Sequence, residues 1–252
     1  MSVIKNNIMC IFGVKGGIGK STLTLNLAGV CSNLKKKVLI VDMDLYGGSI
    51  ALSLNKEVHK TIYNFVDDYI NNRYKDLNDY ITTYNDYIDF IACPKDPRKA
   101  NKINSEYIEI LLDKAKFNYD LVLIDTTHIL DEINLNLLDK SHKVLFVLSN
   151  DSYDIKNMRS LISIFKDLEI EKYKVVLNNS LRPNREYFNL YDIKNVIKTN
   201  IDYELSSKFY IKDIDKYVMD ANIITLDNKY INTEYYKVLE GIVDYAIGED
   251  YE

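Results

Sequence analysis

The sequence has no tryptophan and little proline, glycine or cysteine, and these scarcities exclude several classes of protein. Only 3 prolines and 9 glycines occur in 252 residues, which argues against long disordered linkers. The 3 cysteines, Cys10, Cys31 and Cys93, are odd in number and lack C-x-x-C spacing, so a disulfide framework or zinc site is disfavoured. No signal peptide is recognisable, and no apolar run approaches the roughly 20 residues that span a bilayer. We therefore expect a cytoplasmic protein with no transmembrane segment.

Positive charge is also in short supply. The formal net charge is −5, and the acidic excess lies after residue 150. A protein that coats DNA by neutralising phosphates is more often basic, so DNA binding remains possible through a local patch but is not favoured. Hydrophobic residues make up 47% of the chain, which is ample for a core. The length suits a single domain over residues 1–252.

What the sequence does contain is an alternation of strand and helix patterns. Five short apolar runs are continuous, as expected of parallel strands buried on both faces, and they cover residues 8–12, 38–41, 121–124, 144–148 and 175–177. Between them lie helical patterns such as the face formed by Leu23, Leu27 and Cys31. This alternation predicts a doubly wound, mostly parallel α/β sheet with helices on both faces, and ligands at the carboxyl ends of the strands.

Three further segments have weaker patterns. Residues 61–70 look helical and residues 87–94 look strand-like, with a mixed stretch between them. Residues 231–252 read as an amphipathic helix with an acidic end. Its polar face lacks the lysines and arginines of a membrane-surface helix, so we expect it to pack against the rest of the chain.

A glycine-rich loop, FGVKGGIGKST, occupies residues 12–22, directly after the first strand and before the first helix. Such a loop closes backbone N–H groups around phosphate oxygens, aided by the partial positive charge of the helix N-terminus. Lys20 is expected to meet the β and γ phosphates, the Ser21 hydroxyl to hold magnesium, and Thr22 to donate to the α phosphate. The alternative is a plain glycine turn between strand and helix.

The loop matches x-K-G-G-x-G-K-[ST], and it resembles the deviant phosphate loop of the MinD, ParA and CpaE family of ATPases. The resemblance implies a P-loop NTPase fold, ATP and Mg²⁺ as cofactors, and an ATP-dependent homodimer. It also implies that the additional Lys15 reaches across the dimer interface to the partner's phosphates, as an arginine finger does elsewhere. The residues that the resemblance assigns to nucleotide binding are Lys15, Gly16, Gly17, Ile18, Gly19, Lys20, Ser21 and Thr22.

Three aspartates complete the expected site. Asp42 and Asp44 leave the second strand two residues apart, so both carboxylates can reach the phosphates. The resemblance assigns Asp42 to magnesium and Asp44 to the attacking water. Asp125 directly follows the strand 121–124, and the resemblance assigns it to magnesium binding through a water molecule. The metal set is thus Ser21, Asp42 and Asp125, and the catalytic set Lys15, Lys20 and Asp44.

Two residues have less distinctive surroundings. Asn178 follows the strand 175–177, and in the family an asparagine at this place contacts adenine. His128 follows Asp125-Thr126-Thr127 and is either a structural residue of the loop or a general base.

The resemblance extends over almost the whole chain, and residues 44–54 and 90–148 look most like the CpaE/TadZ branch associated with pilus assembly. The preferred hypothesis is therefore an ATPase switch that positions a pilus, secretion or similar machine through an unidentified protein partner, which could recruit it to a membrane or cell pole. One alternative is a ParA-like DNA-partition ATPase. Another is a metabolic enzyme on the same scaffold, for which no further substrate motif is present.

Overall fold

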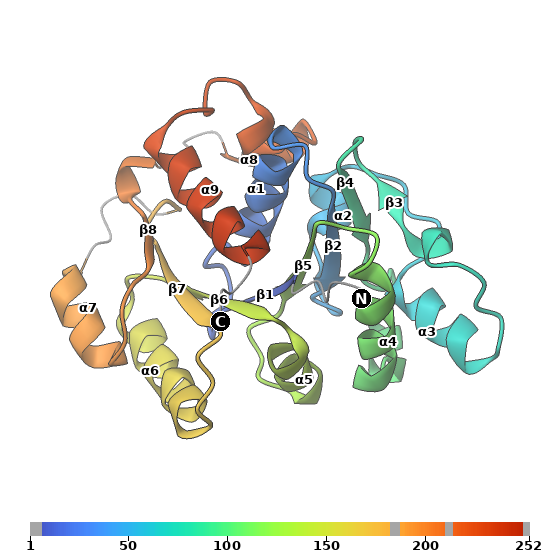
Figure 1. Cartoon of the computed structure of the whole chain (residues 1–252), viewed down its shortest axis with the longest axis horizontal. Coiled ribbons are helices and arrows are strands. Elements are labelled where there is room, and N and C mark those ends of the chain that lie inside the picture. The colour runs from blue at the N-terminus through green and yellow to red at the C-terminus, as the bar shows by residue number, and fades with distance from the viewer. Residues whose placement is uncertain (1–6, 182–186, 210–213, 249–252) are drawn as a thin grey trace.

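One sheet organises the molecule, as the computed structural model shows for residues 7–181, 187–209 and 214–248 (Figure 1). Its eight strands lie in the order β3-β4-β2-β5-β1-β6-β7-β8. The strands are β1 (Ile8–Phe12), β2 (Val38–Met43), β3 (Thr82–Thr83), β4 (Ile88–Ile91), β5 (Leu121–Thr126), β6 (Lys143–Leu148), β7 (Tyr173–Asn178) and β8 (Tyr203–Leu205). Neighbouring strands pair in parallel, except that β3 pairs antiparallel with β4 at one edge. The doubly wound sheet predicted from the sequence is confirmed.

Helices cover both faces of this sheet (Figure 1). The α-helices are α1 (Lys20–Asn33), α2 (Ile50–Ser53), α3 (Ile62–Ile70), α4 (Ser105–Ala115), α5 (Glu132–Lys140), α6 (Ser152–Asp167), α7 (Leu190–Ile197), α8 (Ile214–Met219) and α9 (Glu234–Ile247). Short 3₁₀ turns are η1 (Leu77–Tyr80), η2 (Pro97–Lys102), η3 (Ser207–Phe209) and η4 (Ile224–Leu226). Helices α1 and α9 pack together over one face, and α3 to α7 lie along the other.

The continuous apolar runs are explained by burial on both faces. Along β1, Ile8, Cys10 and Phe12 belong to the core beneath α3 to α7, whereas Met9 and Ile11 belong to the core beneath α1 and α9. All five are at most 3% exposed. A strand in this position cannot alternate apolar with polar residues, because both of its faces are dry.

Two differences from the sequence-based strands bear on function. Strand β2 runs on to Met43 and β5 to Thr126, so Asp42 and Asp125 lie within strands rather than just after them. The two aspartates are direct neighbours in the parallel register. The short strands β3 and β8 were not expected, because neither contains an apolar run: in β8 only Leu205 is fully buried.

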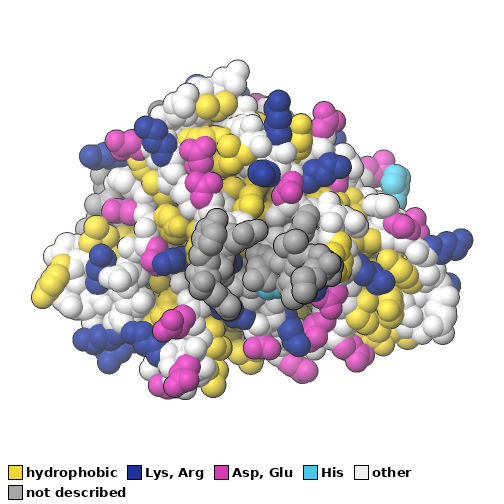
Figure 2. All heavy atoms as spheres, viewed as in Figure 1, with side chains coloured by type: hydrophobic (Ala, Val, Ile, Leu, Met, Phe, Trp, Pro, Cys, Tyr) yellow, Lys and Arg dark blue, Asp and Glu magenta, His cyan; other side chains and the backbone are white. Residues whose placement is uncertain are grey.

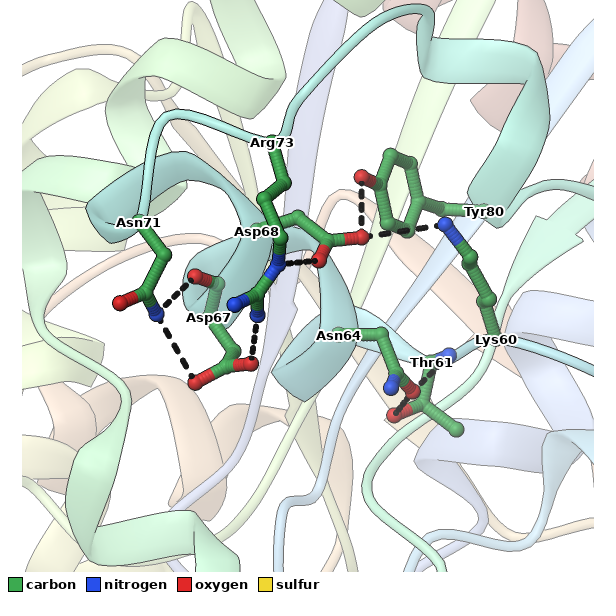
Figure 3. A network of polar contacts seen from close by, with 8 residues as sticks. All are labelled: Lys60, Thr61, Asn64, Asp67, Asp68, Asn71, Arg73 and Tyr80. Carbon is green, nitrogen blue, oxygen red and sulfur yellow. Dashed lines mark hydrogen bonds and ion pairs between the residues drawn. The ribbon is translucent and has the colours of Figure 1, made fainter.

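The mixed segment between the second and fourth strands is held by a polar network around Asp68 (Figure 3). The Asp68 carboxylate accepts hydrogen bonds from Lys60 Nζ at 3.0 Å, Tyr80 Oη at 2.9 Å and Arg73 Nε at 3.0 Å. Burial opposes ionisation, but these three donors lower the pKa of Asp68 to about 2. The network ties α3 to η1 and explains why a segment without a clear apolar pattern is nevertheless ordered.

The two helices expected from the weaker patterns are also present. Residues 62–70 are helical and the C-terminal segment forms α9, which packs against α1 and β8. Cys10 and Cys31 are buried free thiols in the core. Within the described ranges, no helix is both long enough and apolar enough to cross a membrane.

Candidate nucleotide site

The loop that joins β1 to α1 needs glycine for steric reasons. Gly17 and Gly19 have φ values of 71° and 90°, in the left-handed region that side chains disfavour. A Cβ at Gly19 would lie 2.6 Å from Leu181 Cδ1 and 2.8 Å from Asn178 Nδ2. The loop therefore passes directly under the end of β7, and its backbone leads into the N-terminus of α1.

Lys20 is a nearly buried cation at the first residue of α1. Its side chain is 8% exposed, and its Nζ donates a hydrogen bond to the carbonyl oxygen of Lys15 at 3.3 Å. Burial lowers the pKa of Lys20, against the opposing charges of Asp125, Asp44 and Asp154. A poorly hydrated ammonium that bonds to a loop carbonyl is well placed to exchange that bond for phosphate oxygens.

Lys15 forms an ion pair within its own chain. Its Nζ lies 3.1 Å from Oδ2 of Asp151, and the two side chains are 32% and 35% exposed. Asp151 is also the N-cap of α6 and accepts from the backbone N–H groups of Tyr153 and Asp154. The pKa of Asp151 is lowered, chiefly by the hydrogen bond from Lys15. The second lysine of the loop is thus held at the edge of the site.

Asp42 and Asp125 form a buried acidic pair beside the loop. Both are 0% exposed and they are register neighbours in β2 and β5. Burial raises the pKa of Asp42 well above its usual range, and the charge of Asp125 adds to this effect. Burial likewise raises the pKa of Asp125 to about 6, although a hydrogen bond from Ser21 and the charge of Lys20 oppose it. Two such carboxylates favour a bound cation.

The groups present fit a magnesium ion held jointly with phosphate. Asp125 Oδ1 accepts from Thr24 Oγ1 at 3.2 Å, whereas Asp125 Oδ2 is buried and has no hydrogen-bond partner among the described residues. Ser21 lies close enough to the same carboxylate to lower its pKa. Within the described ranges, no three His, Cys, Asp or Glu side chains form a metal cage. Oxygen donors of this kind suit a Mg²⁺ ion whose other ligands are water and phosphate oxygens.

Asp44 stands at the mouth of the site. It is half-buried, its backbone N–H donates to Asp42 Oδ1 at 3.2 Å, and its own Oδ1 accepts from Gly47 N at 3.2 Å. Gly48 allows the segment to fold back, because a Cβ there would lie 2.5 Å from Asp42 Oδ2. The structure therefore brings Asp42, Asp44 and Asp125 to one end of the sheet with Lys20, as the sequence predicts.

Asn178 supports the loop from β7. Its Nδ2 donates to the carbonyl oxygen of Ile18 at 2.9 Å, and its Oδ1 accepts from Ser180 N and Ser180 Oγ at 3.1 and 2.7 Å. Both ends of the amide are therefore used within the chain. An adenine contact at Asn178 stays a prediction, and the second N–H of Nδ2 is the donor available for it.

Sequence reasoning missed the apolar side of this region. A small cavity next to Thr22 and Asn178 is lined by Leu181, Leu205 and Phe209, which come from three different segments. Its apolar side chains enclose only about 20 Å³, too little for a purine base, so it is a packing gap beside Gly19 and Asn178. No sequence motif indicates these apolar side chains, because they come together only when β7, β8 and η3 are in place.

Two acidic residues at the start of α6 were also missed. Asp151 pairs with Lys15, and Asp154 is 1% exposed, with its Oδ2 bonded to Ser149 and its Oδ1 unpartnered within the described part of the chain. The available signal was an aspartate three residues after the end of β6, the strand that neighbours β1. His128 lies on the loop's other side, where its ring is 3.6 Å from the position of a Gly16 Cβ. Its side chain is exposed, and a role as general base rather than as a structural residue of the loop stays a prediction.

Comparison with known proteins agrees with this geometry. The AAA domain family matches residues 6–182. The septum site-determining protein MinD of Synechocystis sp. is 24% identical over 191 residues, which cover 73% of this chain and 68% of that protein. The sporulation initiation inhibitor protein Soj of Bacillus subtilis is 25% identical over 226 residues, which cover 86% of this chain and 85% of Soj.

A solved structure shows the same fold. MinD of Pyrococcus horikoshii, complexed with Mg-ADP, superposes with a TM-score of 0.75 at 20% identity, over 95% of this chain and 94% of that one. The match therefore includes the sheet, the loop and the helices of both layers.

Proposed function

This chain belongs to the AAA domain family, and within it to the MinD/ParA group of ATPases, and from that premise we propose that it is an ATP-dependent dimerisation switch that positions or regulates another cellular assembly. The observation that carries the proposal is the glycine loop with two lysines, one buried at the phosphate position and one at the edge of the site. We take residues 1–252 to act as a single ATPase domain.

The proposed nucleotide contacts follow from the loop. The backbone N–H groups of Gly16 to Gly19, together with Lys20, bind the β and γ phosphates, and Ser21 and Thr22 continue the contact along α1. The loop is preorganised for this, because Asn178 holds the Ile18 carbonyl and the glycines carry the strained backbone. ATP is the expected nucleotide, since the curated relatives belong to an ATPase group.

The proposed chemistry is hydrolysis of the γ phosphate. Magnesium, held through Ser21, Asp42 and Asp125, neutralises phosphate charge and also relieves the repulsion between the two buried carboxylates. Asp44 orients the attacking water, because its carboxylate is half-buried at the mouth of the site and bonded to Gly47 N within the same segment. Lys15 and Lys20 stabilise the charge that develops during transfer.

Dimerisation is the proposed role of Lys15. In the monomer its ammonium pairs with Asp151, and we propose that it leaves Asp151 for the phosphates of a partner subunit when ATP is bound. Large exposed apolar side chains lie within a few residues of the site: Tyr46 at 54%, Ile129 at 52% and Tyr153 at 77% exposed. Such side chains around one site support a protein–protein interface there.

The assembly that the switch serves is proposed from resemblance. Residues 44–54 and 90–148 look most like the CpaE/TadZ branch, which favours a pilus or secretion machine and an unidentified protein partner that sets the cellular address. The names of these relatives refer to septum placement and sporulation, and those processes are stated only of those proteins.

A second candidate function is DNA partition in the manner of ParA. Soj matches a larger share of this chain than MinD does. The outer faces of α6 and α7 carry exposed cations, namely Lys156, Arg159, Lys166, Lys194 and Lys198. Figure 2 shows Lys and Arg side chains gathered in the region where Figure 1 places these two helices. Binding to random duplex DNA that appears only with ATP and weakens steeply with salt would favour this function.

Asp44→Ala tests the proposed function directly. The variant should bind ATP with Mg²⁺ as tightly as the parental protein, release phosphate much more slowly, and accumulate as a dimer. Equilibrium ATP binding, phosphate release and sedimentation are measured on both proteins, with and without Mg²⁺. Phosphate release at the parental rate by Asp44→Ala would remove Asp44 from the mechanism, and absence of ATP binding by the parental protein would end the proposal.

A further inference from the structure

Thr24 is a fully buried threonine in α1, one turn along the helix from Lys20. Its exposed fraction is 0%. Residues three and four positions apart lie on the same face of a helix, so Thr24 shares a face with Ser21 and Lys20. The helix packs against β5, the strand that carries Asp125. A buried hydroxyl at this place is unfavourable unless it has a hydrogen-bond partner.

The hydroxyl of Thr24 lies within hydrogen-bonding distance of two acceptors. Its Oγ1 is 3.0 Å from the carbonyl oxygen of Lys20 and 3.2 Å from Oδ1 of Asp125. In an α-helix the carbonyl four residues back already accepts a backbone N–H, and a carboxylate is a stronger acceptor than a carbonyl. Thr24 therefore links the helix that carries Lys20 to the strand that carries Asp125.

The hydrogen bond from Thr24 makes the two oxygens of Asp125 inequivalent. Oδ1 accepts this bond, whereas Oδ2 is enclosed by the chain and accepts none from any residue that the structure describes. Ser21 and Lys20 lie close enough to the carboxylate to favour its charged form. Because one oxygen is held from α1, the carboxylate cannot rotate freely, and Thr24 fixes its orientation relative to Ser21.

Asp42, the other member of the buried acidic pair, is held differently. Its Oδ1 accepts from Asp44 N at 3.2 Å, and its Oδ2 accepts from Ile50 N at 3.3 Å. Backbone groups thus orient Asp42, whereas a side chain of α1 orients Asp125. A substitution at Thr24 should therefore disturb Asp125 and leave Asp42 in place.

We propose that Thr24 is a positioning residue for magnesium: its hydroxyl holds the Asp125 carboxylate in the orientation that supports Ser21 and the water around the ion. This role rests on the proposed function, because it requires a nucleotide bound with Mg²⁺. Since Asp125 Oδ2 is enclosed, the carboxylate acts through Ser21 and water rather than by direct contact. Partners of this kind orient the ligands of a metal, and losing one typically weakens metal binding by about 10- to 100-fold.

The test measures equilibrium binding of ADP, so that no result depends on hydrolysis. Calorimetry gives the ADP affinity of the full-length protein in EDTA and over a series of free Mg²⁺ concentrations. The midpoint of the increase, corrected for Mg²⁺ that free ADP binds, is the affinity of the ADP complex for Mg²⁺. Thr24→Val keeps the shape of the side chain and removes the hydroxyl. It should weaken Mg²⁺ binding about tenfold and leave the ADP affinity in EDTA unchanged.

A second pair of variants isolates the hydroxyl. Thr24→Ser and Thr24→Ala lack the same methyl group and differ only by the oxygen, so they carry the test if Thr24→Val does not fold. Thr24→Ser should keep the parental Mg²⁺ affinity, and Thr24→Ala should lose as much as Thr24→Val.

Thr225→Val is the matched control for a lost buried hydroxyl. Thr225 is also 0% exposed, and its Oγ1 donates to the carbonyl oxygen of Asn26 in α1 at 2.7 Å. This variant should melt at a lower temperature but bind Mg²⁺ normally. Absence of ADP binding by the parental protein would overturn the proposed function and this role with it. If ADP binds, unchanged Mg²⁺ affinity in Thr24→Ala, or an equal loss in Thr24→Ser or Thr225→Val, would overturn the role of Thr24 alone.

Discussion

The ammonium of Lys15 lies 3.1 Å from the carboxylate of Asp151, so the additional lysine of the glycine loop is paired within its own chain when no partner subunit is present. Any move of Lys15 toward a partner's phosphates must first break this pair. The same aspartate caps α6, which fixes its position relative to the loop. The pair therefore opposes dimerisation by the free energy that it contributes.

Asp151→Asn should release Lys15 without damaging the fold, because asparagine is as good an N-cap as aspartate. Since both partners are about one-third exposed, the pair is worth roughly 0.2–1 kcal/mol after solvent screening. Because each of the two subunits gives up one such pair, the ATP-dependent dimer should then form at concentrations lower by about two- to thirtyfold. Sedimentation over a concentration series measures this. Asp76→Asn, which alters the exposed cap of η1, is the control and should leave the dimer unchanged.

Gly19→Ala should abolish nucleotide binding and lower stability. The φ of 90° alone costs a side chain on the order of 1–3 kcal/mol, and the new Cβ would meet Leu181 and Asn178 at 2.6 and 2.8 Å. Gly241→Ala is the matched control, because Gly241 lies within α9 and a Cβ there makes only an ordinary contact at 3.6 Å. That variant should be neutral or slightly stabilising. Thermal unfolding and ATP binding are measured on both, and equal behaviour would contradict the described loop geometry.

Lys20→Ala should weaken ATP–Mg²⁺ binding sharply. A charge-assisted contact contributes about 1.5–3 kcal/mol, which corresponds to a loss of about 10- to 150-fold in affinity. Lys36→Ala, at an exposed lysine beyond the far end of α1, should bind ATP normally. Calorimetry distinguishes the two. Unchanged affinity of the Lys20 variant would mean that the loop does not hold phosphate.

Stability should fall below about pH 6.5 because of His142. Its Nδ1 accepts from the backbone N–H of Ile8 at 3.3 Å, which requires the neutral ring. Burial lowers the pKa of His142, and Lys116, Lys172 and Lys143 add to the effect against Asp113. A lowered folded pKa means that the unfolded chain binds the proton more readily. The contribution of His142 to stability is therefore fully present above the pKa that His142 has in the unfolded chain, and it is lost as pH falls below that value.

The measurement for His142 is a difference between two proteins. Free energies of unfolding of the parental chain and of His142→Gln are compared from pH 8 to pH 5.5. The parental protein should lose more stability over this range than the variant does, while carboxylate effects cancel between the two. Parallel pH profiles would show that His142 carries no such linkage.

The sheet and the phosphate loop could be predicted from the sequence because their signals are local. An apolar run such as residues 144–148 must be buried on both faces, and the glycine spacing before Lys20 is dictated by close backbone approach to phosphate. The strand limits were less exact, since Asp42 and Asp125 are polar residues inside strands and the pattern ends before them. Burying two carboxylates in a sheet is unfavourable without a cation. A prediction from strand propensity therefore ends each strand before its aspartate.

The remaining parts of the site depend on long-range contacts. Asp151 is more than one hundred residues from Lys15, and only the pairing of β1 with β6 brings them together. Asn178 reaches Ile18 because β7 is the next strand along the sheet.

The most direct test of the central claim compares dimerisation with and without Lys15 when hydrolysis is blocked. Asp44→Ala and the double variant Asp44→Ala/Lys15→Ala are each brought to saturating ATP–Mg²⁺ and examined by sedimentation, after ATP affinity has been measured on dilute monomer. We predict the same ATP affinity for both, a dimer for Asp44→Ala, and a monomer for the double variant, because two anionic nucleotides would then face each other without their cross-subunit cations. An equally stable ATP-dependent dimer in the double variant would contradict the account, since Lys15 would then be only a surface partner of Asp151.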